Sequence, residues 1–293
     1  MTAPTDRRAY ALPSLIAGGV AVGVAPILVR LSEVGPLSTA FWRLWLAIPL
    51  LLALTAATRG PDQGDVRRTP RTFADLALVS APGVFLGAEL CVWHVSLHMT
   101  SVANATLLVN MTPVFAALFG WAAFGRPVSR TFAAGLLLAV GGVAALTSGG
   151  RGGAGSLAGD AVALFAAMIY AGYFLLLGRA RRDFSAAAVM LASTVSAALA
   201  TLPLALAESA FAPATLAGWA ALVALAWIVQ AGGQGLVTFA IAWLPATVSS
   251  LAMLIQPVVA AGLAWTLFDE RLSALQIAGG AVVLLGILIA RRG

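Results

Sequence analysis

Residues 107–142 read LLVNMTPVFAALFGWAAFGRPVSRTFAAGLLLAVGG, and residues 251–286 read LAMLIQPVVAAGLAWTLFDERLSALQIAGGAVVLLG. The two stretches align without a gap at a constant offset of 144 residues, and 11 of the 36 positions are identical. The identical pairs are Leu107/Leu251, Pro113/Pro257, Val114/Val258, Ala116/Ala260, Ala117/Ala261, Trp121/Trp265, Phe124/Phe268, Ser129/Ser273, Ala134/Ala278, Gly135/Gly279 and Gly142/Gly286. Apolar composition alone does not readily align Pro, Trp, Ser and Gly together. The pattern therefore predicts an internal repeat that spans most of the chain.

The composition indicates a membrane protein. Of the 293 residues, 61% are apolar and only 10% are charged, and the mean hydropathy is +0.97. A soluble domain needs more charge than this to cover its surface. All 17 basic residues are arginines, and they lie in short clusters between apolar stretches. We therefore interpret the arginines, and the net charge of +6, as signals of membrane topology that face anionic lipid. The lipid bilayer is an expected partner, and nucleic acid is not.

Windows of about 20 apolar residues, the length that crosses the hydrocarbon core, predict ten transmembrane helices. Their predicted bounds are Leu12–Leu31, Ser38–Thr58, Phe73–Trp93, Val102–Phe124, Phe132–Ser148, Gly159–Arg179, Ser185–Ala207, Thr215–Ala240, Thr247–Phe268 and Ser273–Ala290. Two units of five helices follow, over residues 12–148 and 159–290. Because five is odd, the second unit must enter the membrane upside down relative to the first. We therefore predict an all-α integral membrane fold of two inverted five-helix repeats, the architecture of secondary transporters.

Arginine counts in alternate loops predict the orientation. Thirteen arginines fall on one side, three (Arg30, Arg151 and Arg271) fall on the other, and Arg43 lies within a span. The side that is rich in arginine is expected to be cytoplasmic, which places both termini in the cytoplasm.

The residues of the repeat resemble a known family. Residues 101–118 (SVANATLLVNMTPVFAAL) followed by GRPVS, and residues 244–261 (LPATVSSLAMLIQPVVAA) followed by DERLS, are similar to EamA-type units of the drug/metabolite transporter superfamily. Glu89-Leu-Cys-Val-Trp before the fourth helix resembles the bacterial aromatic amino-acid exporters, although sister branches export other amino acids, sugars and cationic drugs. The resemblance implies alternating-access export of small metabolites across the bacterial inner membrane. The predicted substrates are amino acids, aromatic and other largely neutral ones, and the alternative is export of cationic drugs or other metabolites.

Other classes of function lack sequence support. The chain contains no His-Glu-x-x-His or Gly-x-Ser-x-Gly motif and no carboxylate cluster that would hold a catalytic metal, so an intramembrane enzyme is only a distant alternative. No soluble domain is predicted that would favour a sensor or a scaffold. We expect no cofactor, no metal and no obligate protein partner, and a small molecule as the substrate.

Glu89 is the one carboxylate predicted well inside a span, where a charge needs a partner or water. It either lines the substrate site or forms a structural ion pair with Arg43. The aromatic sequence around Arg43, Phe41-Trp42-Arg43-Leu44-Trp45, favours an arginine that snorkels to the interface. His94 and His98 are predicted near the outer surface, just beyond the third helix.

The remaining candidates are uncharged. Pro113 and Pro257 lie at mid-depth of equivalent helices, and each is either a hinge whose freed carbonyl faces the substrate site or a static kink. Asn110, Gln234, Thr238 and Gln256 are polar at membrane depth, where they either bind substrate or join helices by hydrogen bonds. Tyr170, Tyr173, Phe174 and Trp227 form either an aromatic wall for an apolar part of the substrate or helix packing.

Overall fold

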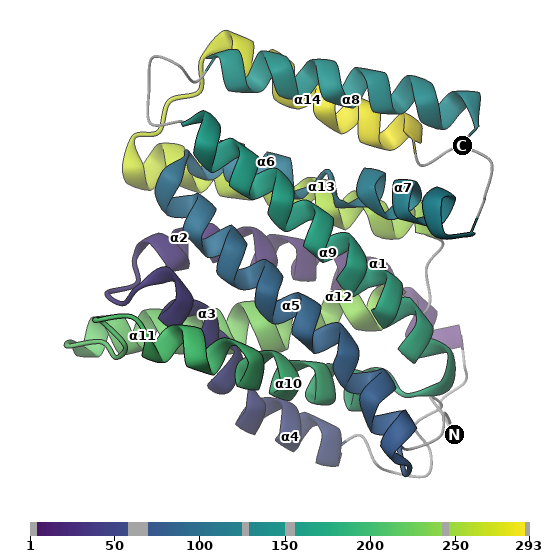
Figure 1. The fold of residues 1–293 in the computed structure, drawn as a ribbon, viewed down its shortest axis with the longest axis vertical. Helices are drawn as coiled ribbons and strands as arrows, with labels where there is room; N and C mark the ends of the chain where they lie inside the picture. The colour runs from purple at the N-terminus through teal and green to yellow at the C-terminus, as the bar shows by residue number, and fades with distance from the viewer. Residues whose placement is uncertain (1–4, 58–69, 125–128, 150–155, 242–245, 291–293) are drawn as a thin grey trace.

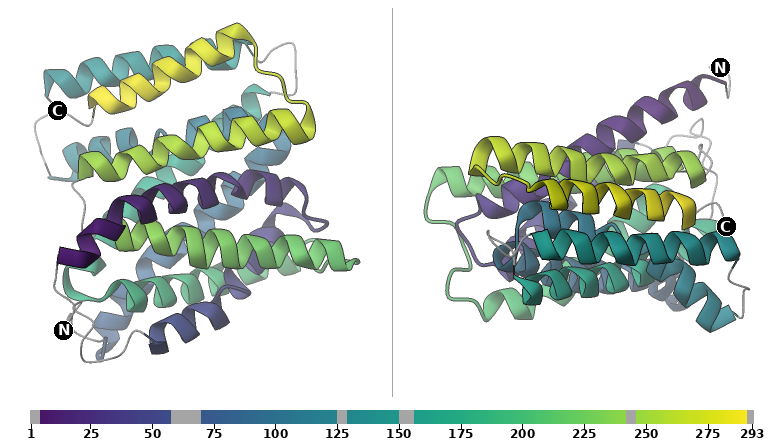
Figure 2. Two further views of the ribbon diagram at one scale, coloured as in Figure 1. Left: turned by 180° about the vertical axis from the view of Figure 1, so that it is seen from behind. Right: turned by 90° about the horizontal axis from the view of Figure 1, so that it is seen from above.

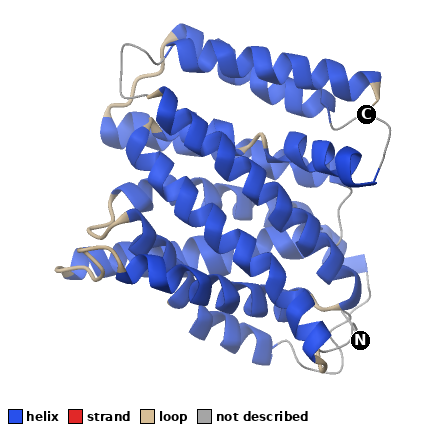
Figure 3. Ribbon diagram, viewed as in Figure 1, coloured by secondary structure: helices blue, strands red, loops and turns tan. Residues whose placement is uncertain are grey.

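The structure is a computed structural model that describes residues 5–57, 70–124, 129–149, 156–241 and 246–290. Every element in these ranges is a helix, and Figure 3 shows no strand among them. The helices are α1 (Thr5–Gly23), α2 (Ala25–Arg30), α3 (Pro36–Trp45), α4 (Ile48–Ala57), α5 (Phe73–Met99), α6 (Val102–Val109), α7 (Thr112–Phe124), α8 (Arg130–Gly149), α9 (Leu157–Asp183), α10 (Ala186–Leu206), α11 (Leu216–Ala224), the π-helix η2 (Leu225–Gly233), α12 (Gln234–Ile241), α13 (Ala246–Phe268) and α14 (Ala274–Ala290).

The helices run across the view of Figure 1 in one bundle, and several of them are long and apolar enough to cross a membrane. Within the described residues, six meet this criterion: Tyr10–Arg30, Pro36–Ala56, Phe73–Met99, Leu157–Asp183, Ala187–Leu206 and Leu216–Ala240. Shorter apolar helices cover Val102–Ala116, Arg130–Ala145, Ile255–Phe268 and Ala274–Ile289. The all-helical membrane fold is thus confirmed, and the total of ten spans stays a prediction.

Three of the predicted spans are broken in two, each just before a proline. The second residue of α2 is Pro26, that of α4 is Pro49 and that of α7 is Pro113. Proline lacks the backbone N–H and crowds the carbonyl four residues earlier, so it is tolerated in the first turn of a helix and disfavoured further along. The breaks at Val24, at Leu46–Ala47 and at Asn110–Met111 follow from this preference. Pro257 differs, because α13 continues through it.

The structure contradicts one predicted helix boundary and confirms another. The prediction that the third span ends near Trp93 is wrong: α5 continues to Met99. The prediction that Thr215–Phe268 divides into two helices is confirmed, since α12 and α13 are separate helices that both pack against α1.

Helices α8 and α14 lie side by side at one edge of the bundle, as Figures 1 and 2 show. Their contact is reciprocal: a Cβ atom built on Gly142 would lie 2.8 Å from the carbonyl oxygen of Gly279, and one on Gly286 would lie 2.7 Å from that of Gly135. Gly142 and Gly286 are equivalent positions of the sequence repeat, and so are Gly135 and Gly279. Two antiparallel helices that touch through equivalent residues are related by a local two-fold axis. We call this contact the glycine seam.

The two halves enter the bundle in opposite directions. The first span of the first half ends at Arg30. The first span of the second half, α9, begins next to Thr100, because Asp160 in its first turn accepts a hydrogen bond from the Thr100 hydroxyl. Arg30 donates a hydrogen bond to the Thr100 carbonyl, so both points lie at one end of the bundle, which we call the Arg30 end. Figure 1 shows that α1 begins and α14 ends at the opposite end.

Candidate functional site

Charged, amide and phenol side chains from both halves lie together inside the bundle, all of them buried except Tyr170, which is half-buried. They are Arg43 of α3, Glu89 of α5, Gln230 of η2, Gln234 of α12, and Tyr170 and Tyr173 of α9. We call this set the central polar cluster. Glu89 is 3% exposed and Gln230 only 1%. Burying a charge among apolar helices costs several kcal/mol unless the charge is compensated. The central polar cluster is therefore the leading candidate for a functional site in the described structure.

Helix α5 holds Glu89 in place by close packing on one side. Asp75 and Thr72 form a capping box that starts the helix. Further along, a Cβ atom built on Gly87 would lie 3.0 Å from the Ala197 carbonyl, so α5 and α10 approach with no room for a side chain. Glu89 is two residues later on this tightly held stretch, which fixes its backbone.

Glu89 has no hydrogen-bonding partner among the described residues, and no nitrogen of Arg43 comes within 4.0 Å of it. Arg43 and Tyr170 are nevertheless close enough to interact with its charge. The structure therefore shows a carboxylate and a guanidinium that are neighbours without a direct ion pair.

Arg43 does not snorkel to the surface, contrary to the sequence-based expectation. Its side chain is 5% exposed, because it lies on the face of α3 that packs against η2. Its Nε donates to Gln230 Oε1 at 3.1 Å, while Nη1 is buried and has no partner among the described groups. The aromatic residues around it pack elsewhere: Trp42 contacts Phe211 and donates its indole N–H to the Phe211 carbonyl.

Three aromatic rings of α9 form one face. Tyr170 and Tyr173 are stacked, with ring centroids 5.4 Å apart and planes 8° from parallel, and Phe174 lies 4.7 Å from Tyr170. Both tyrosine hydroxyls are within hydrogen-bonding reach of Gln234. Trp227 is placed apart from these rings: it is 51% exposed, and its indole N–H donates to the Leu46 carbonyl at the break between α3 and α4.

Three other residues that the sequence marks as candidate substrate ligands lie outside the central polar cluster. Asn110 donates to the Thr106 carbonyl at 2.7 Å, and Thr238 donates to the Gln234 carbonyl at 2.7 Å, so both hydrogen bonds stay within their own segments. Gln256 is partly buried, and its backbone carbonyl lies where α13 approaches Gly23 of α1. The site role predicted for these residues stays a prediction.

The two candidate hinges differ. At Pro113 the helix is broken, and the carbonyl of Val109 that proline leaves without its N–H partner accepts a hydrogen bond from Thr112 Oγ1 at 2.6 Å. This carbonyl is thus satisfied within its own turn and is not left free for a substrate. Pro257 is buried in the continuous helix α13. The role of either proline as a hinge stays a prediction.

Sequence reasoning assigned no site role to several residues of this region. Gln230 lies in a π-helical segment, which hydrophobic periodicity does not reveal, and π-helical turns often occur at functional sites. His94, expected near the surface, is fully buried within α5 with its Nδ1 beside the Pro36 carbonyl at 3.2 Å. Trp93 is 7% exposed, and its indole Nε1 has no partner among the described residues.

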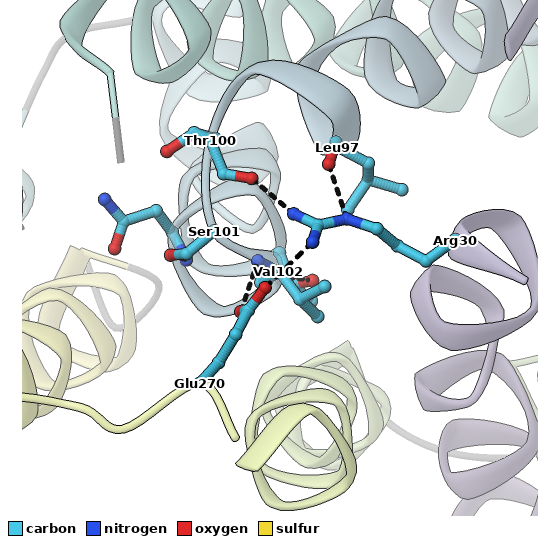
Figure 4. A network of polar contacts seen from close by, with 8 residues as sticks. Arg30, Leu97, Thr100, Ser101, Val102 and Glu270 are labelled. Atoms are coloured by element: carbon cyan, nitrogen blue, oxygen red, sulfur yellow. Dashed lines mark hydrogen bonds and ion pairs between the residues drawn. The ribbon is translucent and has the colours of Figure 1, made fainter. Parts of the chain in front are cut away.

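The two halves are joined at the Arg30 end by an ion pair, shown in Figure 4. Arg30 Nη1 lies 2.9 Å from Glu270 Oε1, and its other nitrogens donate to the carbonyls of Leu97 and Thr100 at 2.7 and 2.6 Å. The second Glu270 oxygen accepts from the backbone N–H of Val102 at 2.9 Å and caps the start of α6. One carboxylate of the second half thus holds the ends of α2 and α5 and the start of α6 together.

Two further carboxylates make the same kind of contact across the halves. Glu208, after α10, accepts from the N–H groups of Leu37 and Ser38 at the start of α3. Glu33, before α3, accepts from the backbone N–H and the hydroxyl of Thr215 at the start of α11. The Thr215 hydroxyl, followed by the Thr215 backbone, lowers the pKa of Glu33 below its usual value. The stabilisation from this cap is therefore complete at neutral pH and is lost as the pH falls through that lowered pKa.

A buried network beside the ion pair extends the contact to α14. Asp160 at the start of α9 accepts from Thr100 Oγ1 at 2.7 Å and from Asn104 Nδ2 at 3.1 Å. Asn104 Oδ1 in turn accepts from Gln276 Nε2 at 3.3 Å. The Arg30 end is thus closed by polar contacts in which each half caps or pairs with the other.

Comparisons with known proteins give a family and a fold. A comparison with curated proteins gives no match. A solved structure described only as "Crystal structure of protein" is similar over 97% of this chain and 98% of its own, with a TM-score of 0.66 and 18% sequence identity, which supports the fold alone. The sequence profile described as the EamA-like transporter family matches twice, over residues 10–148 and 157–292. The two matches coincide with the two halves that the sequence repeat predicts. The chain therefore belongs to the EamA-like transporter family of the drug/metabolite transporter superfamily, and it is a multi-pass membrane transporter of small molecules.

Proposed function

We propose that the protein exports amino acids, aromatic and other largely neutral ones, by alternating access, with the substrate at the central polar cluster. The observation that carries the proposal is Glu89, a buried carboxylate that has no hydrogen-bonding partner in the described structure. An amino acid brings an ammonium group, for which such a carboxylate is a natural partner. The stacked Tyr170 and Tyr173 offer an aromatic face for its side chain.

The position of the cluster supports a transport mechanism. Its carboxylate and guanidinium come from the first half, and its glutamines and tyrosines come from the second. A ligand held there touches both halves, so binding can bias the equilibrium between two arrangements of them. Opening the Arg30 end would require the Arg30–Glu270 ion pair and the neighbouring caps to separate.

The test is flux in proteoliposomes that contain the full chain. We expect accumulation or release of labelled phenylalanine and other neutral amino acids above empty liposomes, with less activity for sugars and for cationic dyes. Cationic drugs are the second candidate, because an unpaired buried carboxylate also attracts a cation without a carboxylate. Preference for the dyes over phenylalanine would establish that alternative and reject amino-acid export.

We further propose that the protein lies in a bacterial inner membrane with both termini in the cytoplasm and the Arg30 end outward. The thirteen-to-three distribution of arginines between the two sets of loops supports this orientation. Cys91 is the only cysteine and is buried, so a Cys91→Ser background allows single cysteines to be read one at a time. An impermeant thiol reagent on intact cells is expected to label Gly153→Cys and to spare Gln63→Cys. The opposite result reverses the orientation.

A further inference from the structure

We propose that Arg43 binds the carboxylate of the substrate, so that Arg43 and Glu89 together form a clamp for a zwitterion. This assignment rests on the proposed function, which places the substrate at the central polar cluster. It gives Arg43 a direct role in place of the structural one that its sequence context indicates.

Arg43 leaves part of its hydrogen-bonding capacity unused in the described structure. A guanidinium has five N–H donors, and Arg43 uses one of its nitrogens, Nε, on Gln230 at 3.1 Å. Its Nη1 is buried with no partner among the described residues, in a side chain that is 5% exposed. An unmade hydrogen bond to a buried charged group costs more than a typical net hydrogen bond contributes. A substrate carboxylate supplies the missing acceptor and matches the planar fork of the guanidinium.

Arg43 and Glu89 are separated by more than the distance of a direct ion pair. The two opposite charges are buried as neighbours, yet no nitrogen–oxygen distance between them is within 4.0 Å. A structural ion pair would be expected to close this distance, because direct contact offsets the desolvation of both ions. Gln230, acting as a positioning residue, holds the guanidinium through Nε instead. The ammonium and carboxylate of an amino acid are attached to one carbon, so one small molecule can engage both charges.

A second unpaired donor lies on the same helix as Glu89. Trp93 lies four residues after Glu89 and therefore one turn along the same side of α5. Its indole N–H is buried without a partner in the described structure. Among the described residues the region thus has unpartnered nitrogens on Arg43, Trp93 and His94 and one carboxylate without a hydrogen-bonding partner, which fits a ligand that carries both an anionic and a cationic group.

The test uses three ligands that share one side chain. L-Phenylalanine has both charges, phenethylamine lacks the carboxylate, and 3-phenylpropionate lacks the ammonium. In the wild-type protein we expect phenylalanine to inhibit its own labelled flux at a concentration at least about tenfold lower than either analogue. In Arg43→Gln the inhibition constant of phenylalanine should rise about 30-fold, while that of phenethylamine stays within about twofold. In Glu89→Gln the inhibition constant of 3-phenylpropionate should stay close to its wild-type value, while that of phenylalanine should rise.

Arg30→Gln is the matched control, because Arg30 is also an arginine of the first half and is partly enclosed, but it lies at the closed end, where it is paired with Glu270. It is expected to change the constants of phenylalanine and phenethylamine by the same factor. Arg43→Lys, which keeps the charge and loses the fork, serves if Arg43→Gln does not fold, and its preference for phenylalanine over phenethylamine should fall several-fold. Ligand-induced shifts of the wild-type melting temperature give a measurement that needs no variant, with phenylalanine effective at the lowest concentration.

The outcomes separate the two proposals. If the wild-type protein transports no phenylalanine, the proposed function is wrong, and the proposed clamp of Arg43 and Glu89 is rejected as well. If phenylalanine is transported and Arg43→Gln, folded with an unchanged melting temperature, loses phenylalanine and phenethylamine in equal measure, export stands and the carboxylate subsite is wrong. An unchanged preference in Arg43→Gln has the same meaning.

Discussion

Glu89→Gln is expected to reduce phenylalanine flux by about a hundredfold or more and to leave the melting temperature near that of the wild type. The neutral amide keeps the shape of the side chain but removes the charge that would attract the ammonium group of the substrate. Loss of one partner of a buried charge pair with a ligand costs several kcal/mol, which corresponds to a change of this size. Flux in proteoliposomes and thermal melts on the same purified sample measure the two quantities together.

The competing explanation is that Glu89 serves only to neutralise Arg43. Glu89→Gln would then lower the melting temperature, because a buried arginine is left without a counter-charge, and the double variant Glu89→Gln, Arg43→Gln would recover much of the loss. The absence of a direct contact between the two side chains argues against this outcome. Cys91→Ala, a buried change two residues away on α5, is the control and should keep its flux. Normal flux in Glu89→Gln together with a lowered melting temperature would remove Glu89 from the site.

Gly142→Ala is expected to destabilise the protein by about 1–3 kcal/mol, and Gly142→Val by more, because an added side chain overpacks the glycine seam. A Cβ atom at this position would lie 2.6 Å from the backbone nitrogen of Val283, and backbone cannot rotate away as a side chain can. Gly286→Ala, at the equivalent position, should have an effect of the same size, since its Cβ would lie 2.5 Å from the Ala139 nitrogen. Thermal melts and the yield of monodisperse protein in detergent measure the effect.

Gly141→Ala is the matched control for this prediction. Gly141 neighbours Gly142 in α8, but a Cβ atom built on it meets nothing within 4 Å. Alanine is also a better helix former than glycine, so the control should be neutral or slightly stabilising. Equal melting temperatures for Gly141→Ala and Gly142→Ala would show that the seam does not depend on this close approach.

The sequence predicted the helical membrane fold and its repeat because these depend on patterns that are local or periodic. The pairs Gly135/Gly279 and Gly142/Gly286, found by alignment, are residues at which α8 of the first half touches α14 of the second. The breaks before Pro26 and Pro49 were missed, because a hydropathy window registers apolar length and not the missing N–H of proline.

The candidate site was predicted less completely. Glu89, Tyr170, Tyr173 and Gln234 were recognised from polarity or aromaticity at membrane depth, and the structure brings them into one cluster. The aromatic neighbours of Arg43 favour the interface, whereas its side chain lies on the face of α3 that packs against η2. Its partner Gln230 is 187 residues away in sequence, so only the packing of the two halves could reveal the pair. Trp227 illustrates the opposite error, since a tryptophan inside a span need not face a site.

The glycine seam has a consequence for how such a chain can arise and change. A surface that touches its own equivalent needs no second sequence to complete it, so one five-helix unit carries both sides of this particular contact. Joining two copies in one gene fixes their ratio at one to one and frees them from remaining identical. The seam has kept its glycines in both copies, while the acidic and basic groups of the polar cluster are in one copy and its amides and phenols in the other. Fusion thus allows a symmetric scaffold to recognise a molecule that has no symmetry.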